Sequence, residues 1–81
     1  MDNSDRDSLE ALHKRIGRNV KNKREEMGLS QLRLAEEIGQ KSTTIISQAE
    51  LGKTKHFNIE QLYKISFVLE CEICEFFNSK E

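Results

Sequence analysis

The chain has 81 residues, which is enough for one domain with a modest hydrophobic core. It contains no proline and four glycines, a composition that favours helices joined by short turns. No apolar run approaches the roughly 18 residues of a membrane-spanning helix, and the acidic segment Met1–Asp7 is unlike a signal peptide, so we expect a cytoplasmic protein with no membrane partner.

The formal net charge of −1 conceals an uneven distribution of charge along the chain. Residues 1–12 contain one basic and four acidic residues, residues 13–55 contain ten and five, and residues 56–81 contain two and five. The middle segment therefore has a net charge of +5, which is typical of a surface that binds nucleic-acid phosphates. Chance variation between segments is the alternative, so charge alone does not identify a DNA-binding protein.

The apolar pattern divides the chain into a frayed or disordered N-terminus (1–8), a domain (9–78) and a C-terminal tail (79–81). The first predicted helix begins at Leu9 and stops at Gly28. The later apolar residues expected to share its buried face are Leu12, Ile16, Val20 and Met27.

Capping residues mark the helices that follow. Ser30 is a suitable N-cap for a second helix that stops at Gly39, and a third helix begins at Lys41 or Ser42 and closes near Gly52. 

A fourth helix follows Asn58, which can form a capping box with Gln61, and a last helical turn covers Ile73–Phe77. The sequence therefore predicts an all-α fold, a compact domain of five helices.

The second and third helices are close enough in sequence to form a helix-turn-helix. Residues Gln31–Ile38 and Thr43–Glu50 would be joined through the turn Gly39–Ser42. Ala35 is small, so the two helices can cross closely. In DNA-binding proteins this arrangement leaves the outward face of the later helix free to enter the major groove.

A series of short motifs runs through the chain: Ile16-Gly17, Arg24, Gly28-Leu29-Ser30-Gln31, Leu34-Ala35, Ser47, Glu50, Gly52-Lys53 and Leu62-Tyr63-Lys64-Ile65. In this order and spacing they resemble the Xre-like regulators, whose DNA-binding domain is of the lambda-repressor and Cro type. The resemblance spans Ile16–Phe77 and implies a lambda-repressor-like fold that binds double-stranded DNA. Between Ala35 and Ser47 the chain is one residue longer than the family pattern, so the register of base contacts is open by one residue.

The resemblance implies roles for residues on and around the third helix. The candidates for contact with base edges, all polar and on its outward face, are Thr43, Thr44, Ser47 and Gln48. The candidates for contact with phosphates, at the start of the second helix and on both sides of the third, are Gln31, Lys41, Ser42, Lys53, Thr54 and Lys55. Ordinary capping and surface positions are the alternative for Thr43, Thr44 and Ser47.

Two further expectations concern the third helix. In similar members of the family an arginine late in the first helix pairs with a glutamate late in the third, which implies a bidentate ion pair between Arg24 and Glu50. Two unrelated surface charges are the alternative. Ile45 adjoins Ile46 and either contacts a thymine methyl group or is buried, and we favour burial.

Other polar motifs do not indicate a reaction or a metal. Cys71-Glu72-Ile73-Cys74 is a lone CxxC, and only His13 and His56 are available as further ligands, at no recognised spacing. We therefore expect no metal and no cofactor, and we expect both cysteines to be small core residues. No pairing of nucleophile and base, and no pair of carboxylates, points to an enzyme.

Aromatic residues near the C-terminus exceed what one thin helical layer can hide. The residues predicted to form a dimer interface are Phe67, Ile73, Phe76 and Phe77. Completion of the core of a single chain is the alternative. A homodimer would match a palindromic operator, so the sequence predicts a homodimeric transcriptional regulator. The alternative function is a protein-interaction or antitoxin-type module that acts through a protein partner.

Overall fold

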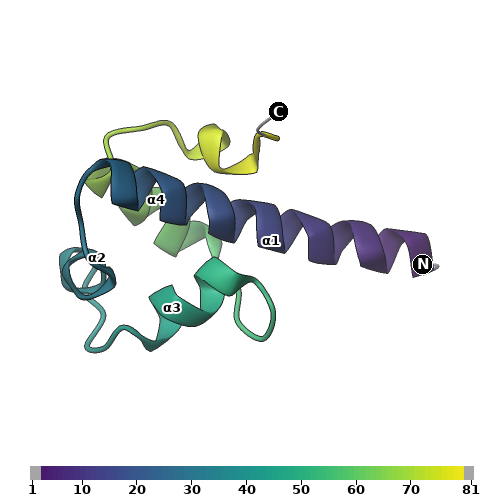
Figure 1. Cartoon of the computed structure of the whole chain (residues 1–81), viewed down its shortest axis with the longest axis horizontal. Coiled ribbons are helices and arrows are strands. Elements are labelled where there is room, and N and C mark those ends of the chain that lie inside the picture. The colour runs from purple at the N-terminus through teal and green to yellow at the C-terminus, as the bar shows by residue number, and fades with distance from the viewer. Residues whose placement is uncertain (1–2, 80–81) are drawn as a thin grey trace.

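Residues 3–79 form four α-helices and one 3-10 helix, of which the longest is α1 (Asn3–Glu26), as Figure 1 shows. The third α-helix and the 3-10 helix pack against α1, and the second α-helix packs against the third and fourth. The computed structural model describes the backbone of these residues and the side chains of residues 8–79. The shorter elements are α2 (Gln31–Glu37), α3 (Thr44–Leu51), α4 (Ile59–Val68) and the 3-10 helix η1 (Ile73–Phe77). No strand occurs among them, and the predicted all-α fold is confirmed.

The first helix begins earlier than the apolar pattern predicts. Its backbone is helical from Asn3, six residues before Leu9, and Figure 1 shows its first turns extending beyond the other elements. Acidic residues favour the first turn of a helix through the helix dipole, a signal that apolar periodicity does not register. The expectations for residues 1–2 and 80–81 lie outside the described residues.

One hydrophobic core joins the described elements. Each contributes a side chain with no exposed surface: Val20 of α1, Leu34 of α2, Ile46 of α3, Ile65 of α4 and Phe76 of η1. The other buried apolar residues are Ile16, Ala35, Ile38, Ala49, Phe57, Leu62 and Leu69. Met27, expected on the buried face, is instead 41% exposed, because α1 ends one residue before it.

Asn19 holds the C-terminal segment against α1. Its buried side-chain nitrogen Nδ2 donates hydrogen bonds to the backbone carbonyl oxygens of Phe76 and Asn78, each at 2.8 Å. The Arg15 guanidinium donates a longer bond of 3.5 Å to the carbonyl of Phe77. These contacts place η1 on the side of α1 opposite α3 (Figure 1).

The burial of Phe76 corrects its predicted place in a dimer interface. Its side chain is 0% exposed and completes the core of the single chain. The bonds from Asn19 fix the backbone of η1 so that Phe76 points inward, whereas Phe77 and Ile73 remain half-buried at the surface.

Gly17 allows α1 and α3 to approach each other closely. A Cβ atom at this position would lie 2.5 Å from the carbonyl oxygen of Glu50 and would also overlap the carbonyl of Ala49. At the end of α3, Gly52 has a φ of +71° and lies against the backbone of Lys14. The position of α3 is therefore set by backbone contact with α1.

We expect Gly17→Ala to lower the free energy of unfolding by about 1–3 kcal/mol, because the atoms that the added methyl group meets are backbone atoms that cannot rotate away. Urea denaturation monitored by circular dichroism measures this change. Ser8→Ala, at an exposed position of the same helix, is the control and should stay within about 0.5 kcal/mol of the wild type. Equal stability of the two variants would contradict the close approach.

Candidate nucleic-acid interface

The turn between α2 and α3 determines where the third helix begins. α2 ends at Glu37 and α3 begins at Thr44, one residue after Thr43, where the predicted helix-turn-helix places its second helix, and later than the alternative starts Lys41 and Ser42. The Ser42 hydroxyl accepts a hydrogen bond from the Thr44 backbone N–H at 3.4 Å and donates to the Thr44 hydroxyl at 3.3 Å. Thr43 forms no side-chain cap. The Ser42 hydroxyl, one residue before the N-cap Thr43, thus serves as the side-chain cap of α3.

Apolar side chains hold α2 against α3. Leu34 and Ala35 of α2 and Ile46 of α3 have no exposed surface, which agrees with the close crossing expected at Ala35. Ile45 is half-buried and packs against the same core, so the burial that the sequence favours for this residue is only partial. The opposite face of α3 is left at the surface.

A bidentate ion pair joins α1 to α3. Arg24 donates from Nε to Glu50 Oε2 at 2.7 Å and from Nη2 to Glu50 Oε1 at 3.1 Å. The two side chains are 8% and 3% exposed. Arg24 also donates from Nη1 to the carbonyl of Leu29 at 2.8 Å, which fixes the segment that leads into α2. The predicted structural ion pair is confirmed.

Gln31 is the third side chain of this network. Its Nε2 donates to Glu50 Oε1 at 2.9 Å. A side-chain amide carries two hydrogens, so this bond leaves one hydrogen for another acceptor. Gln31 is half-buried and stands at the first position of α2. The network therefore orients a donor at the surface where the sequence predicts a phosphate contact.

The residues predicted to contact bases are grouped at the start of α3. Thr44 is exposed, and Thr43, Ser47 and Gln48 are half-buried. The Ser47 hydroxyl donates to the Thr44 carbonyl at 3.2 Å, so its oxygen remains able to accept a hydrogen bond. Threonine, serine and glutamine side chains, which are polar and uncharged, therefore share the outer surface of the helix.

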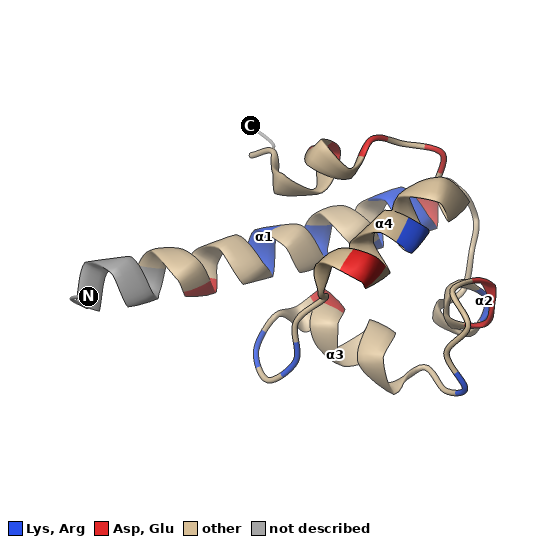
Figure 2. Cartoon of the chain, turned by 180° about the vertical axis from the view of Figure 1, so that it is seen from behind, with Lys and Arg blue, Asp and Glu red and all other residues tan. Residues whose placement is uncertain are grey.

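The predicted phosphate-binding residues lie on both sides of α3. Lys41 and Ser42 are exposed in the preceding turn, and Lys53, Thr54 and Lys55 are exposed in the loop that follows the helix. Figure 2 shows the basic residues of that loop beside α3 and another basic residue in the turn near α2. The structure thus brings the predicted phosphate contacts to the same side as the polar face.

A stacked pair of imidazoles attaches the loop after α3 to α1. The rings of His13 and His56 are 3.6 Å apart between centroids and inclined by 10°. Burial, and then the neighbouring His56, lower the pKa of His13 below its usual value. The stack is therefore favoured by neutral rings, and it restrains a loop that carries Lys53 and Lys55.

Three cations on α1 lie beside the predicted interface and were missed by the sequence analysis. Lys14, Arg18 and Lys21 line a groove together with Gln31 and Ser47. Their spacing of four and three residues places them on one helical face. The spacing can be seen in the sequence. The structure is needed to show that this face of α1 lies beside α3 and lines a groove.

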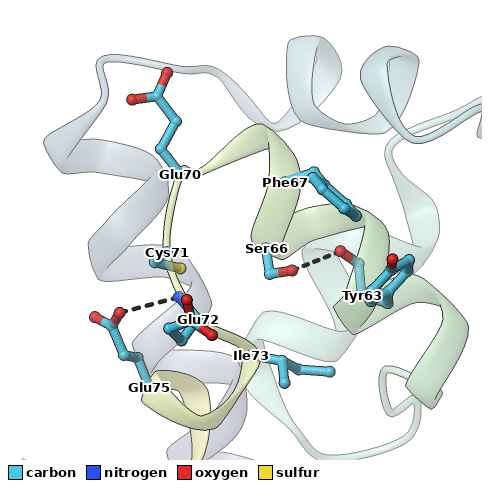
Figure 3. Close-up of a pocket in the computed structure, with 8 residues that line it drawn as sticks. All are labelled: Tyr63, Ser66, Phe67, Glu70, Cys71, Glu72, Ile73 and Glu75. Atoms are coloured by element: carbon cyan, nitrogen blue, oxygen red, sulfur yellow. Dashed lines mark hydrogen bonds between the residues drawn. The ribbon is translucent and has the colours of Figure 1, made fainter.

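A second surface gathers aromatic and acidic side chains. Tyr63 and Phe67 are 56% and 67% exposed, and their rings meet edge to face with centroids 4.9 Å apart. Figure 3 shows them beside Ile73 and the segment that carries Glu70 and Glu72, and all of these residues line a pocket of about 480 Å³. Of the predicted dimer residues, Phe67 is the most accessible.

The cysteines of the CxxC motif have different surroundings. Cys71 packs against the core, and burial raises the pKa of its thiol. Cys74 is exposed, so the expectation of two core cysteines is correct only for Cys71. Both are free thiols, and within residues 8–79 no three His, Cys, Asp or Glu side chains are placed to hold a metal ion.

Two adjacent helices, a packed crossing and a polar outer face define a helix-turn-helix protein. The sequence pattern of the Helix-turn-helix family matches residues 20–76, and the chain belongs to this family, of the Xre and Cro type. Its domain is a DNA-binding domain of transcriptional regulators. No curated protein matches the chain. None of the helices in the described residues is long and apolar enough to cross a membrane.

We expect Glu50→Gln to lower the free energy of unfolding by about 3–5 kcal/mol, because it leaves the buried Arg24 guanidinium without its counter-charge. Adding Arg24→Met should recover part of the loss. Urea denaturation of the single and double variants measures both effects.

The matched control for this prediction is Glu37→Gln, which breaks the exposed ion pair between Arg33 and Glu37. An exposed pair contributes only about 0–1 kcal/mol. If Glu50→Gln and Glu37→Gln destabilise the protein equally, the buried pair does not lock α1 to α3.

Proposed function

We propose that the protein is a sequence-specific transcriptional regulator that binds double-stranded DNA as a homodimer, with α3 in the major groove. The observation that carries the proposal is the polar outer face of α3, on which Thr44 is exposed and Ser47 and Gln48 are half-buried, between exposed lysines of the preceding turn and the following loop. Lys41 precedes this face and Lys53 and Lys55 follow it. Basic side chains can fix the helix on the phosphates while the polar face reads the base edges.

The side chains of α3 suit contact with A·T base pairs. Gln48 can form two hydrogen bonds with an adenine, and the methyl group of Thr44 can contact that of a thymine. Thr43 and Ser47 supply hydroxyl groups that pair with several bases. Because Ile45 packs inward, its polar neighbours along the helix are left to face the groove.

The residues proposed to contact phosphates around α3 differ in whether their side chains must move before they can bind. Lys41, Lys53 and Lys55 are exposed. Thr54 lies between two of them in the loop that the histidine stack restrains. The Ser42 hydroxyl hydrogen is engaged with Thr44, so its contact with a phosphate requires rotation of the hydroxyl.

A homodimer is proposed because one copy reads only half of a palindromic site. Ile59, Tyr63 and Phe67 follow one another at intervals of four residues on α4 and are 68%, 56% and 67% exposed. This apolar stripe can pair with its own copy across a two-fold axis. Ile73 lines a pocket with Tyr63 and Phe67, and both Ile73 and Phe77 are half-buried, so we propose that they extend this interface.

Selection from randomised duplex DNA should yield a palindromic consensus, and affinity for that duplex should fall steeply as salt is raised. Gln48→Ala should relax one position in each half-site and cost roughly 1–3 kcal/mol of discrimination there. Sequencing of the selected pools and fluorescence anisotropy at two salt concentrations measure these effects. Flat enrichment would overturn the proposed function and favour a module that acts through a protein partner.

We expect Phe67→Ala to raise the dissociation constant of the homodimer about 30-fold, which corresponds to the loss of about 2 kcal/mol from a central aromatic contact. Sedimentation velocity over a range of concentrations measures it. The control is Leu51→Ala, which removes an equally exposed apolar side chain (63% against 67%) that lines the groove of α1 instead. Equal effects of the two substitutions would contradict a dimer built on α4.

A further inference from the structure

A groove between α1 and α3 is lined by cations. Lys14, Arg18 and Lys21 form one wall, and Lys53 closes the groove at the end of α3. The volume of the groove is about 380 Å³, and it is open to solvent. Because residues 14, 18 and 21 are spaced by four and three positions, their side chains project along one line of the helix.

Among the described residues that line the groove, no carboxylate is free to balance these cations. Its only carboxylate, Glu50, accepts hydrogen bonds from Arg24 and Gln31 and is 3% exposed. None of the cations that line the groove forms an ion pair within the described part of the chain. Like charges at this spacing repel one another, so an anion bound in the groove would relieve a repulsion built into the free protein.

The groove is continuous with the proposed DNA interface. Gln31 and Ser47 line it and also belong to the predicted phosphate and base contacts. A nucleic-acid strand in contact with Gln31 at the start of α2 therefore lies beside Lys21. The other two cations, Arg18 and Lys14, follow along the same helix. An extended polyanion fits this row of cations better than a compact ion does.

We infer that the basic face of α1 is a second phosphate-binding surface, at which Lys14, Arg18 and Lys21 neutralise the DNA backbone beside Gln31. This inference rests on the proposed function and assigns a role to α1 in addition to the role of α3. Lys14 and Arg18 precede the segment 20–76 that matches the family, so the surface extends the interface beyond the helix-turn-helix. It contributes affinity without base specificity, since phosphates carry no sequence information.

The test compares the wild type with the triple variant Lys14→Gln, Arg18→Gln, Lys21→Gln on the duplex selected for the wild type. Each phosphate contact contributes about 0.9 to the slope of log affinity against log salt, so the triple variant, which removes three cations from each of the two protomers, should lose about 5.4 of that slope. Between 50 and 200 mM salt, its affinity should therefore fall roughly 1,000-fold less than that of the wild type. The selected consensus should not change.

Two control variants separate this effect from loss of structure or of any surface charge. The triple variant Lys14→Arg, Arg18→Lys, Lys21→Arg keeps the charges and should keep the slope. Lys64→Gln removes a cation that pairs with Glu60 on α4 and should leave the slope unchanged. Circular dichroism and urea denaturation of every variant verify folding.

The outcomes distinguish this inference from the proposed function. If the wild type selects a consensus with a steep salt dependence and the glutamine variant keeps the same slope, the α1 surface is overturned while the proposed function stands. If the wild type shows neither enrichment nor salt dependence, both are overturned. A glutamine variant with a shallower slope and an altered consensus would also overturn the inference, because α1 would then read sequence.

Discussion

The buried ion pair between Arg24 and Glu50 is the contact on which the proposed DNA-binding surface depends. One carboxylate receives hydrogen bonds from α1 and from the first residue of α2, while it is itself carried by α3. The same guanidinium holds the carbonyl of Leu29 at the entrance to α2. Three helices are thus fixed through one charged cluster. Separating the partners of a buried ion pair costs free energy, so the pair tolerates little displacement. The cluster therefore constrains the angle of α3 more tightly than apolar packing alone.

The helix α1 separates two surfaces with different chemistry. On one side, Gly17 allows backbone contact between α1 and α3, and the cations of α1 line the groove between the two helices. On the other, Asn19 binds the carbonyls at the end of η1 and draws the C-terminal segment over the core. Figure 2 shows acidic residues in the connection after α4, away from the basic loop beside α3. A net charge near zero therefore coexists with a locally positive face, and the resulting asymmetry can orient the molecule as it approaches DNA.

The sequence predicts those parts of the structure that depend on local chemistry. The capping box of Asn58 and Gln61 forms as predicted, with hydrogen bonds of 2.7 and 2.9 Å, because both partners lie within one turn. Local chemistry does not predict which of Phe67 and Phe76 is buried, since both are apolar and near the C-terminus. Their difference arises from the contact of Asn19 with a segment nearly sixty residues later. Asn19 itself carries no sequence signal that separates it from an ordinary surface residue.

The difference between local and long-range contacts also explains which parts of the candidate site the sequence predicts. The pairing of Arg24 with Glu50 could be anticipated only from resemblance to other proteins, because 26 residues separate them. α3 begins at Thr44, later than its predicted start, because the Ser42 hydroxyl accepts the Thr44 N–H and leaves Ser42 and Thr43 before the helix. The row Lys14, Arg18 and Lys21 is regular in sequence, yet a regular row of cations on a long helix usually faces only solvent. It becomes a candidate binding surface because the glycine contact and the buried ion pair together bring α3 alongside it.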